Sequence, residues 1–145
     1  MHQKGMPRFD TYRLVKGEDL NHHGTLFAGR SAEWFVESAF ISAAHVVPPE
    51  NIVCVNIHGM HFSRPVEKGD VIRFTSRLVL TGRTRLVVHT TLSRQDDNPP
   101  VVEGFISFVN VDDTGKPVPH GVTVEALTPE ERDLESRARA LPRRG

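Results

Sequence analysis

Four extended runs with only short connections between them occupy residues 51–111, and they limit the possible folds more than any other feature. The runs are NIVCVNIHGMHF (51–62), VIRFTSRLVL (71–80), TRLVVHTTL (84–92) and VVEGFISFVNV (101–111). In the second run, Ile72, Phe74, Leu78 and Leu80 are expected to share one face. Strands joined by such short turns pair with their neighbours in antiparallel fashion. The sequence therefore predicts a largely antiparallel sheet.

One long helix is expected before this sheet. From Thr25 to about Ala44, small or apolar residues recur at helical spacing, and Pro48-Pro49 ends the pattern. A short strand at 11–15 precedes the helix. Alanines along the apolar stripe would let the helix lie close to the sheet.

A second, shorter helix is expected near the C-terminus. Thr128 and Glu131 form a capping box, and Pro129 occupies the first helical position, which predicts a helix over about 128–141. The predicted fold class is therefore α+β. A largely antiparallel sheet wraps around one central helix in a single domain over residues 1–145, with its core at about 10–120.

Composition argues against several classes of partner. The 145 residues contain 18 Lys and Arg and 18 Asp and Glu, so neither nucleic acid nor an anionic membrane is an expected partner. The N-terminal residues lack an apolar signal core. The only cysteine, Cys54, excludes an internal disulfide and is expected to be an inert buried thiol. We expect a cytoplasmic protein.

Several familiar chemistries lack their motifs. The chain has neither a glycine-rich phosphate loop nor a Gly-x-Ser-x-Gly nucleophile elbow. His58 and His61, three residues apart on a predicted strand, are expected to point to opposite faces, so they could not share a metal. No metal site is expected.

The stretch NHHGTLFAGRSAEWFVESAF (21–40) combines a polar entrance with acids on a helix. Glu33 and Glu37 are four residues apart on one helix face, a spacing that favours an ordinary solvated stripe. Their aromatic neighbours leave little of the helix facing water, however, and a carboxylate in such surroundings could act as an acid or base. Both interpretations remain open. Amide groups at the start of the helix could polarise a carbonyl oxygen, and Asn21 could orient a water molecule or simply form a turn.

Three segments together resemble the hotdog-fold acyl-CoA thioesterases of the bacterial acyl-CoA hydrolase type. They are DLNHHGTLFAGRSAEWFVESA, IHGMHFSRPVEKGDVI and VNVDDTGKPVP, which lie in the family's order within residues 10–120. The resemblance implies a hotdog fold and hydrolysis of an acyl-CoA to free acid and coenzyme A, with no separate cofactor. It also implies self-association as a dimer, or as a trimer or dimer of dimers, with active sites between subunits.

The resemblance assigns roles to individual residues. Asn21 matches the loop asparagine, and the amides of Gly24, Ala28 and Gly29 match the oxyanion hole. The residues that match substrate-binding segments, which line the coenzyme A groove, are His23, Arg64, Gly82, Arg83 and Lys116.

One position departs from the family pattern. The usual catalytic aspartate falls on Val36, and the next residue, Glu37, is the remaining acid. We hypothesise that Glu37 activates water or attacks the thioester. One rival is a hotdog 3-hydroxyacyl dehydratase or hydratase that uses His23 and Glu37, whose spacing of 14 residues fits. The other is a non-catalytic acyl-CoA-binding protein, which Val36 favours.

Overall fold

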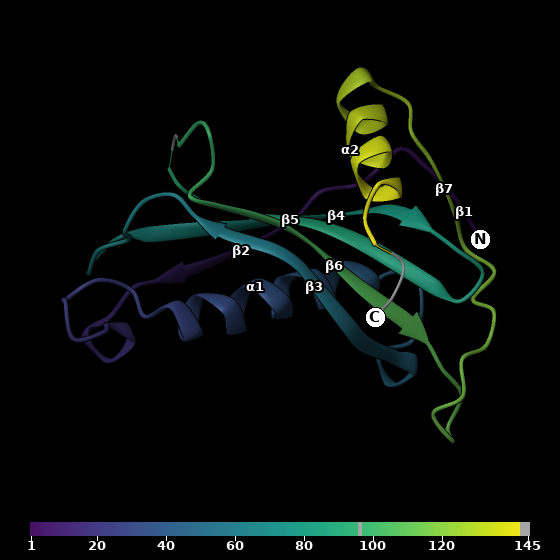
Figure 1. The fold of residues 1–145 in the computed structure, drawn as a ribbon, viewed down its shortest axis with the longest axis horizontal. Helices are drawn as coiled ribbons and strands as arrows, with labels where there is room; N and C mark the ends of the chain where they lie inside the picture. The colour runs from purple at the N-terminus through teal and green to yellow at the C-terminus, as the bar shows by residue number, and fades with distance from the viewer. Residues whose placement is uncertain (96, 143–145) are drawn as a thin grey trace.

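A five-stranded antiparallel sheet forms the centre of the molecule (Figure 1). The computed structural model describes residues 1–95 and 97–142. The sheet has the order β2-β4-β5-β6-β3, and every neighbouring pair is antiparallel. Its strands are β2 (Phe9–Leu14), β3 (Ile52–Phe62), β4 (Val71–Thr81), β5 (Arg85–Arg94) and β6 (Val102–Asn110). The four predicted runs and the earlier short strand are confirmed as strands of one sheet.

The two helices cover opposite faces of this sheet (Figure 1). Helix α1 (Ala28–Ala43) packs on one face, where Phe35, Ile72, Leu86 and Ile106 belong to the main core. Helix α2 (Pro129–Arg139) lies on the other face with a smaller cluster. This arrangement, an antiparallel sheet around one long helix, is the hotdog fold that the resemblance implied.

Short elements complete the chain. Strands β1 (His2–Lys4) and β7 (Thr123–Glu125) form a separate parallel pair that the sequence did not predict. The 3-10 turns are η1 (Gly17–Asp19) and η2 (Pro49–Asn51). Thr128 caps α2 as predicted, because its hydroxyl accepts a hydrogen bond from the Glu131 amide at 3.1 Å. The Glu131 carboxylate accepts from the Leu127 amide at 2.8 Å, one residue before the position that a capping box requires.

Helix α1 begins at Ala28, three residues later than predicted. The preceding residues are held in extended form, because the Leu26 amide donates to the Val66 carbonyl at 2.7 Å and the Phe27 amide to the Asp19 carbonyl at 2.9 Å. These hydrogen bonds fasten the loop to neighbouring segments, so the first helical turn cannot extend back to Thr25.

Two β-bulges overturn predictions that assumed strict alternation. A register shift between Leu78 and Leu80 moves Leu80 to the α2 side, so it does not share a face with Leu78. Another shift lies between His58 and His61, whose partners on β6 are Phe105 and Glu103. These partners are two residues apart, so both histidines lie on the same face of the sheet, contrary to prediction.

Cys54 is exposed on edge strand β3, so its predicted burial is wrong. An edge strand has a neighbour on one side only, and the apolar run around Cys54 is therefore largely uncovered. Partial burial still raises the pKa of the Cys54 thiol. That shift disfavours the thiolate and agrees with an unreactive side chain.

Candidate functional site

The loop before α1 is organised by Asn21. Its side-chain oxygen accepts hydrogen bonds from the backbone amides of His23 at 2.8 Å and Thr25 at 3.2 Å. Its side-chain nitrogen donates to the Thr25 hydroxyl at 3.1 Å. Gly24 turns the chain with φ +84°, a conformation that favours glycine. Asn21 therefore has a structural role in the turn, and it also lines a cavity.

Asp19 connects this loop to the helix, a role that sequence reasoning missed. The residue is only 3% exposed. One carboxylate oxygen accepts a hydrogen bond from the Lys16 amide at 2.9 Å, and the other lies 3.4 Å from Arg30 Nε. Asp19 thus ties the loop to the first turn of α1. Its position two residues before Asn21 in a polar turn was the only signal in the sequence.

The amino end of α1 presents unused amide groups. The amides of Ala28 and Gly29 have no hydrogen-bond acceptor within the described residues, and Phe27 supplies no side-chain cap. A Cβ atom at Gly29 would lie 2.6 Å from the Phe27 ring, so a larger residue there would displace that ring. Amides at a helix start carry partial positive charge and can bind an oxyanion.

A mostly apolar cavity of about 310 Å³ adjoins this helix start. Its lining residues are Asn21, Leu26, Ala28, Ser31, Phe62, Ser63, Arg64, Pro65, Val66, Leu92, Val101 and Val102. Ser31 was not predicted; it is 2% exposed, and its hydroxyl has no partner in the described part of the chain. The Arg64 guanidinium donates to the Pro99 carbonyl at 2.7 Å. The cavity has the size and character to receive an acyl group.

Glu37 lies outside this cavity. It is nine residues after Ala28, which places it about 180° around the helix from that cavity-lining residue. Its carboxylate accepts a hydrogen bond from Arg13 at 2.5 Å, and its side chain is 55% exposed. Of the two interpretations that the sequence left open, Glu37 therefore fits the solvated one. Val36 is half-buried and shares a helix face with Gly29, seven residues earlier.

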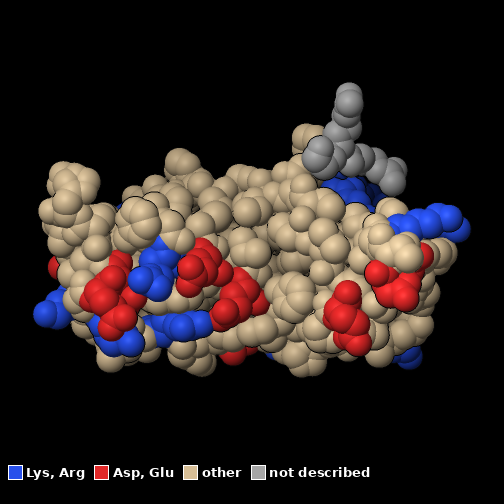
Figure 2. All heavy atoms as spheres, turned by 90° about the horizontal axis from the view of Figure 1, so that it is seen from below, with Lys and Arg blue, Asp and Glu red and all other residues tan. Residues whose placement is uncertain are grey.

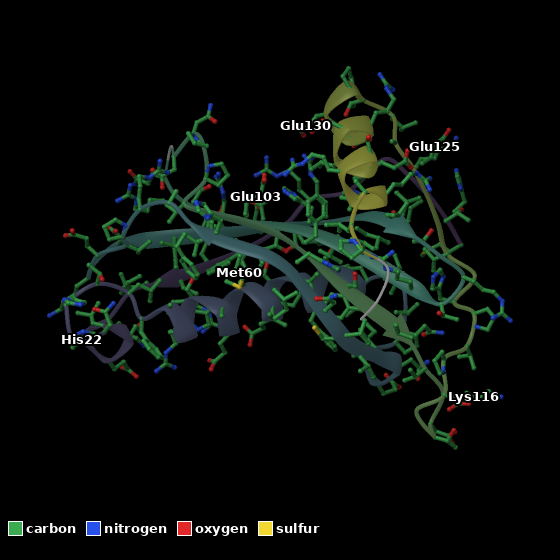
Figure 3. All side chains as sticks on the ribbon, viewed as in Figure 1. His22, Met60, Glu103, Lys116, Glu125 and Glu130 are labelled. Carbon is green, nitrogen blue, oxygen red and sulfur yellow. The ribbon has the colours of Figure 1, made fainter. Side chains whose placement is uncertain are left out.

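The residues assigned to the coenzyme A groove do not come together within one subunit. Arg64 precedes β4, whereas Gly82 and Arg83 follow it, and this strand has 11 residues. Its length is roughly 33 to 36 Å. Lys116 lies in a turn near the same end as Arg83, whose carbonyl accepts from the His120 amide at 3.2 Å. Figure 3 shows Lys116 and the helix-start loop, marked by His22, at opposite ends of the molecule.

His23 is exposed, and its ring lies 3.9 Å from that of His22. Within the described residues, His23 has no hydrogen bond or ion pair with Glu37. The pairing that a dehydratase would need is therefore not formed in a single subunit.

Of the two edge strands of the sheet, β3 presents a row of apolar side chains. On β3 the exposed fractions are 45% for Val53, 41% for Val55, 44% for Ile57 and 44% for Phe62. Strand β3 contains no Lys, Arg, Asp or Glu. Seen from the α1 side, charged groups gather in the lower half of the surface, below a broad uncharged area (Figure 2). An exposed apolar edge strand is a surface suited to pairing with another chain.

Two further findings concern metals and membranes. Within residues 1–95 and 97–142, no three His, Cys, Asp or Glu residues are grouped so that they could hold a metal ion. In the same ranges, no helix has the length and apolar character needed to cross a membrane.

The hotdog fold and the cavity at the start of its central helix define the class to which this chain belongs. Residues 23–101, more than half of the chain, match the family model of the thioesterase superfamily. The chain belongs to the thioesterase superfamily, and the family resemblance inferred from the sequence is confirmed.

Known relatives and structures agree with this assignment. An uncharacterized acyl-CoA thioester hydrolase, YkhA of Bacillus subtilis, is 27% identical over 105 residues, which are 70% of this chain and 60% of YkhA. The cytosolic acyl coenzyme A thioester hydrolase of Rattus norvegicus is 28% identical over 134 residues, which are 86% of this chain but only 33% of the rat protein. A crystal structure of an apo-hexameric acyl-CoA thioesterase superposes with a TM-score of 0.83 at 29% identity, covering 95% of this chain and 92% of the other.

Proposed function

We propose that this protein hydrolyses acyl-CoA thioesters to a free acid and coenzyme A. The observation that carries the proposal is the apolar cavity of about 310 Å³ beside two unused helix amides, in a chain of the thioesterase superfamily. The names of the relatives support acyl-CoA as the substrate class. Water is the only co-reactant that the reaction needs. The single cysteine suits a reducing compartment, and we place the protein in the cytoplasm.

The acyl chain enters the cavity and brings the thioester carbonyl to the start of α1. Water adds to the carbonyl carbon, and the amides of Ala28 and Gly29 stabilise the resulting oxyanion, with Gly24 keeping the approach open. The carbon–sulfur bond then breaks, the acid leaves, and the coenzyme A thiolate takes up a proton. Asn21 positions the attacking water.

Glu37 is the proposed base or nucleophile. Because its carboxylate lies on the side of α1 away from the cavity, it cannot reach a thioester carbonyl held by the Ala28 and Gly29 amides of its own subunit. It would act on a thioester that is held by the helix-start amides of another subunit and passes along the outside of this α1. A second subunit packed beside α1 would create such a path. In this arrangement the hydrogen bond from Arg13 keeps the Glu37 carboxylate oriented until substrate binds.

Self-association also explains the scattered coenzyme A residues. Pairing of the β3 edges of two subunits, in antiparallel orientation, would bring one subunit's Arg64 and His23 towards the other's Gly82, Arg83 and Lys116. The apolar side chains of β3 provide the contact surface. The hexameric structural relative supports a still larger assembly built from such pairs.

Replacement of one carboxylate tests the assignment of Glu37. We expect Glu37→Gln to lower kcat for acyl-CoA by about 100-fold or more, because an amide cannot remove a proton from water. The measurement is thiol release from a panel of short, long and aromatic acyl-CoAs. Glu33→Gln is the matched control: it removes an exposed acid one helical turn earlier and should leave kcat unchanged.

The result also separates the rival functions. Wild-type kcat in Glu37→Gln would refute the assignment. Tight acyl-CoA binding without thiol release by the wild-type chain would instead support a binding protein, the candidate that Val36 favours. Hydration of a crotonyl thioester without hydrolysis would support the dehydratase.

A further inference from the structure

A second cavity lies on the face of the sheet opposite α1. Its volume is about 290 Å³, and we call it the distal cavity. The residues that line it are Arg8, Arg73, Thr75, Arg77, His89, Thr91, Glu103, Glu130, Asp133, Leu134 and Arg137. They come from the chain before β2, from β4, β5, β6 and from α2. Figure 3 shows Glu103 and Glu130 on this side of the sheet, near α2. No residue of the proposed hydrolytic site lines this cavity.

The acids of the distal cavity are already paired. Glu103 lies 3.1 Å from His89 and accepts a hydrogen bond from Arg137 at 2.5 Å. Glu130 pairs with Arg77 at 2.6 Å, and Asp133 lies 3.8 Å from Arg137.

The basic side chains are less fully used. Arg8 lies 3.4 Å from Asp10, outside the lining. Arg73 has no ion pair among the residues that the structure describes, and its Nε is buried without a hydrogen-bond acceptor. The Nε of Arg77 is likewise buried without a hydrogen-bond acceptor in the described part of the chain. A buried Nε–H without an acceptor costs free energy, although Arg77 also donates from its terminal nitrogen to Glu130. These two Nε–H groups, and the unpaired charge of Arg73, therefore favour an added anion.

The strand register places the Arg73 and Arg77 side chains on the same face of the sheet, on either side of one pair of threonines. Arg73 and Arg77 stand on either side of Thr75 on β4, each about 7 Å from it along the strand. Directly across from Thr75 on β5 is Thr91, and the Thr75 hydroxyl itself donates to Asp10 at 2.7 Å. The Thr91 hydroxyl has no hydrogen-bond partner within the described ranges. Two guanidinium groups and one free hydroxyl can therefore converge on one small ligand.

We propose that the distal cavity binds a phosphate-bearing small molecule, with Arg73, Arg77 and Thr91 as its principal contacts. A phosphate group offers several oxygens in a tetrahedral arrangement and can meet all three donors at once. Guanidinium groups match such oxygens through paired hydrogen bonds. Because Glu103 is already bound by His89 and Arg137, it does not compete for Arg73.

Titration with pyrophosphate by isothermal calorimetry tests the proposal. Wild-type protein should show saturable binding, and Arg73→Gln should weaken it about tenfold, through loss of a charged donor. Thr91→Val, which preserves side-chain shape, should weaken it about threefold. Arg139→Gln is the matched control, since Arg139 is an exposed arginine of α2 outside the cavity. Thermal unfolding of each variant checks that it is folded.

Parallel titrations with inorganic phosphate and ADP identify the source of the phosphate. If ADP binds more tightly than inorganic phosphate, and Arg73→Gln abolishes that difference, the ligand is a nucleotide. If ADP and inorganic phosphate bind with equal affinity, the ligand is free phosphate. The proposal is overturned if wild-type protein shows no saturable binding, or if Arg73→Gln binds as well as Arg139→Gln. Thioester hydrolysis is not part of the measurement, so failure of the proposed function would leave this result interpretable.

Discussion

Among single side chains, Asp19 links the candidate site to the body of the fold. It is a buried acid that holds the Lys16 amide and approaches Arg30 at the first turn of α1. The same residue's carbonyl accepts from the Phe27 amide. Through these contacts the position of the helix start depends on a residue that does not line the cavity.

Removal of this carboxylate should affect both stability and activity. We expect Asp19→Ala to lower the free energy of unfolding by about 1 to 3 kcal/mol, because the Lys16 amide loses its acceptor. Acyl-CoA turnover should fall as the loop loosens. Urea unfolding and thiol release measure the two effects. The control is Glu18→Ala, which removes a neighbouring acid that is 71% exposed; equal losses in both variants would contradict the role of Asp19.

At the scale of secondary-structure elements, charged contacts help to attach α2 to the sheet. Arg137 of α2 binds Glu103 of β6, and its guanidinium lies 5.3 Å from the centre of the Phe105 ring. Leu134 and Ala138 supply the apolar part of the contact. The His89 imidazole and the Arg137 guanidinium lower the pKa of Glu103 from 4.5 to about 2.

This shift predicts a pH dependence of stability. The pKa of Glu103 is lower in the folded chain than in the unfolded chain, so its stabilising contribution is complete above about pH 5. It is lost as the pH falls from about 4.5 towards about 2. Because the side chain is 39% exposed, solvent screening limits the contribution to on the order of 1 kcal/mol.

Urea unfolding of wild type and Glu103→Gln at pH 6 and pH 3 provides the measurement. The difference in unfolding free energy between the two proteins should shrink at the lower pH. Glu50→Gln, a change at an exposed acid without an ion pair among the described residues, serves as control. A difference for Glu103→Gln that stays constant with pH would refute the coupling.

For the whole molecule, the β3 edge is an exposed apolar surface. Its backbone can pair on one more side, and Val53, Val55 and Ile57 remain exposed. A second copy of the chain would cover these side chains and complete the proposed groove. Assembly and catalysis should therefore be lost together.

Ile57→Lys tests this dependence. A lysine on the edge strand places charge where another strand would pair, and we expect a fall in native mass and at least about tenfold lower turnover. Light scattering after size exclusion gives the mass, and thiol release gives the turnover. Val71→Lys, at a position that is 50% exposed on β4, should change neither. An unchanged mass for Ile57→Lys would contradict pairing through β3.

Local pattern was sufficient to predict most of the fold. Strands and helices depend on residue spacing, turn residues and caps, all of which act between near neighbours in the chain. The four runs from 51 to 111 and the helix cap at Thr128 could therefore be predicted from the sequence. The β-bulges could not be predicted in this way, because the position of an extra residue depends on how the strand pairs with its neighbour. Leu80 and the pair His58 and His61 were misplaced for this reason.

The sequence by itself determined the α+β class, the helix-start loop around Asn21 and, through resemblance, membership of the thioesterase superfamily. Only the tertiary structure decided which residues meet: Asn21, Ser31 and Arg64 around one cavity, Arg73 and Arg77 around another, and Glu37 with Arg13 on the outer side of α1. Burial, and therefore the partner of each charge, depends on packing between segments distant in the chain. The spacing of residues along the chain does not show which distant segments pack together.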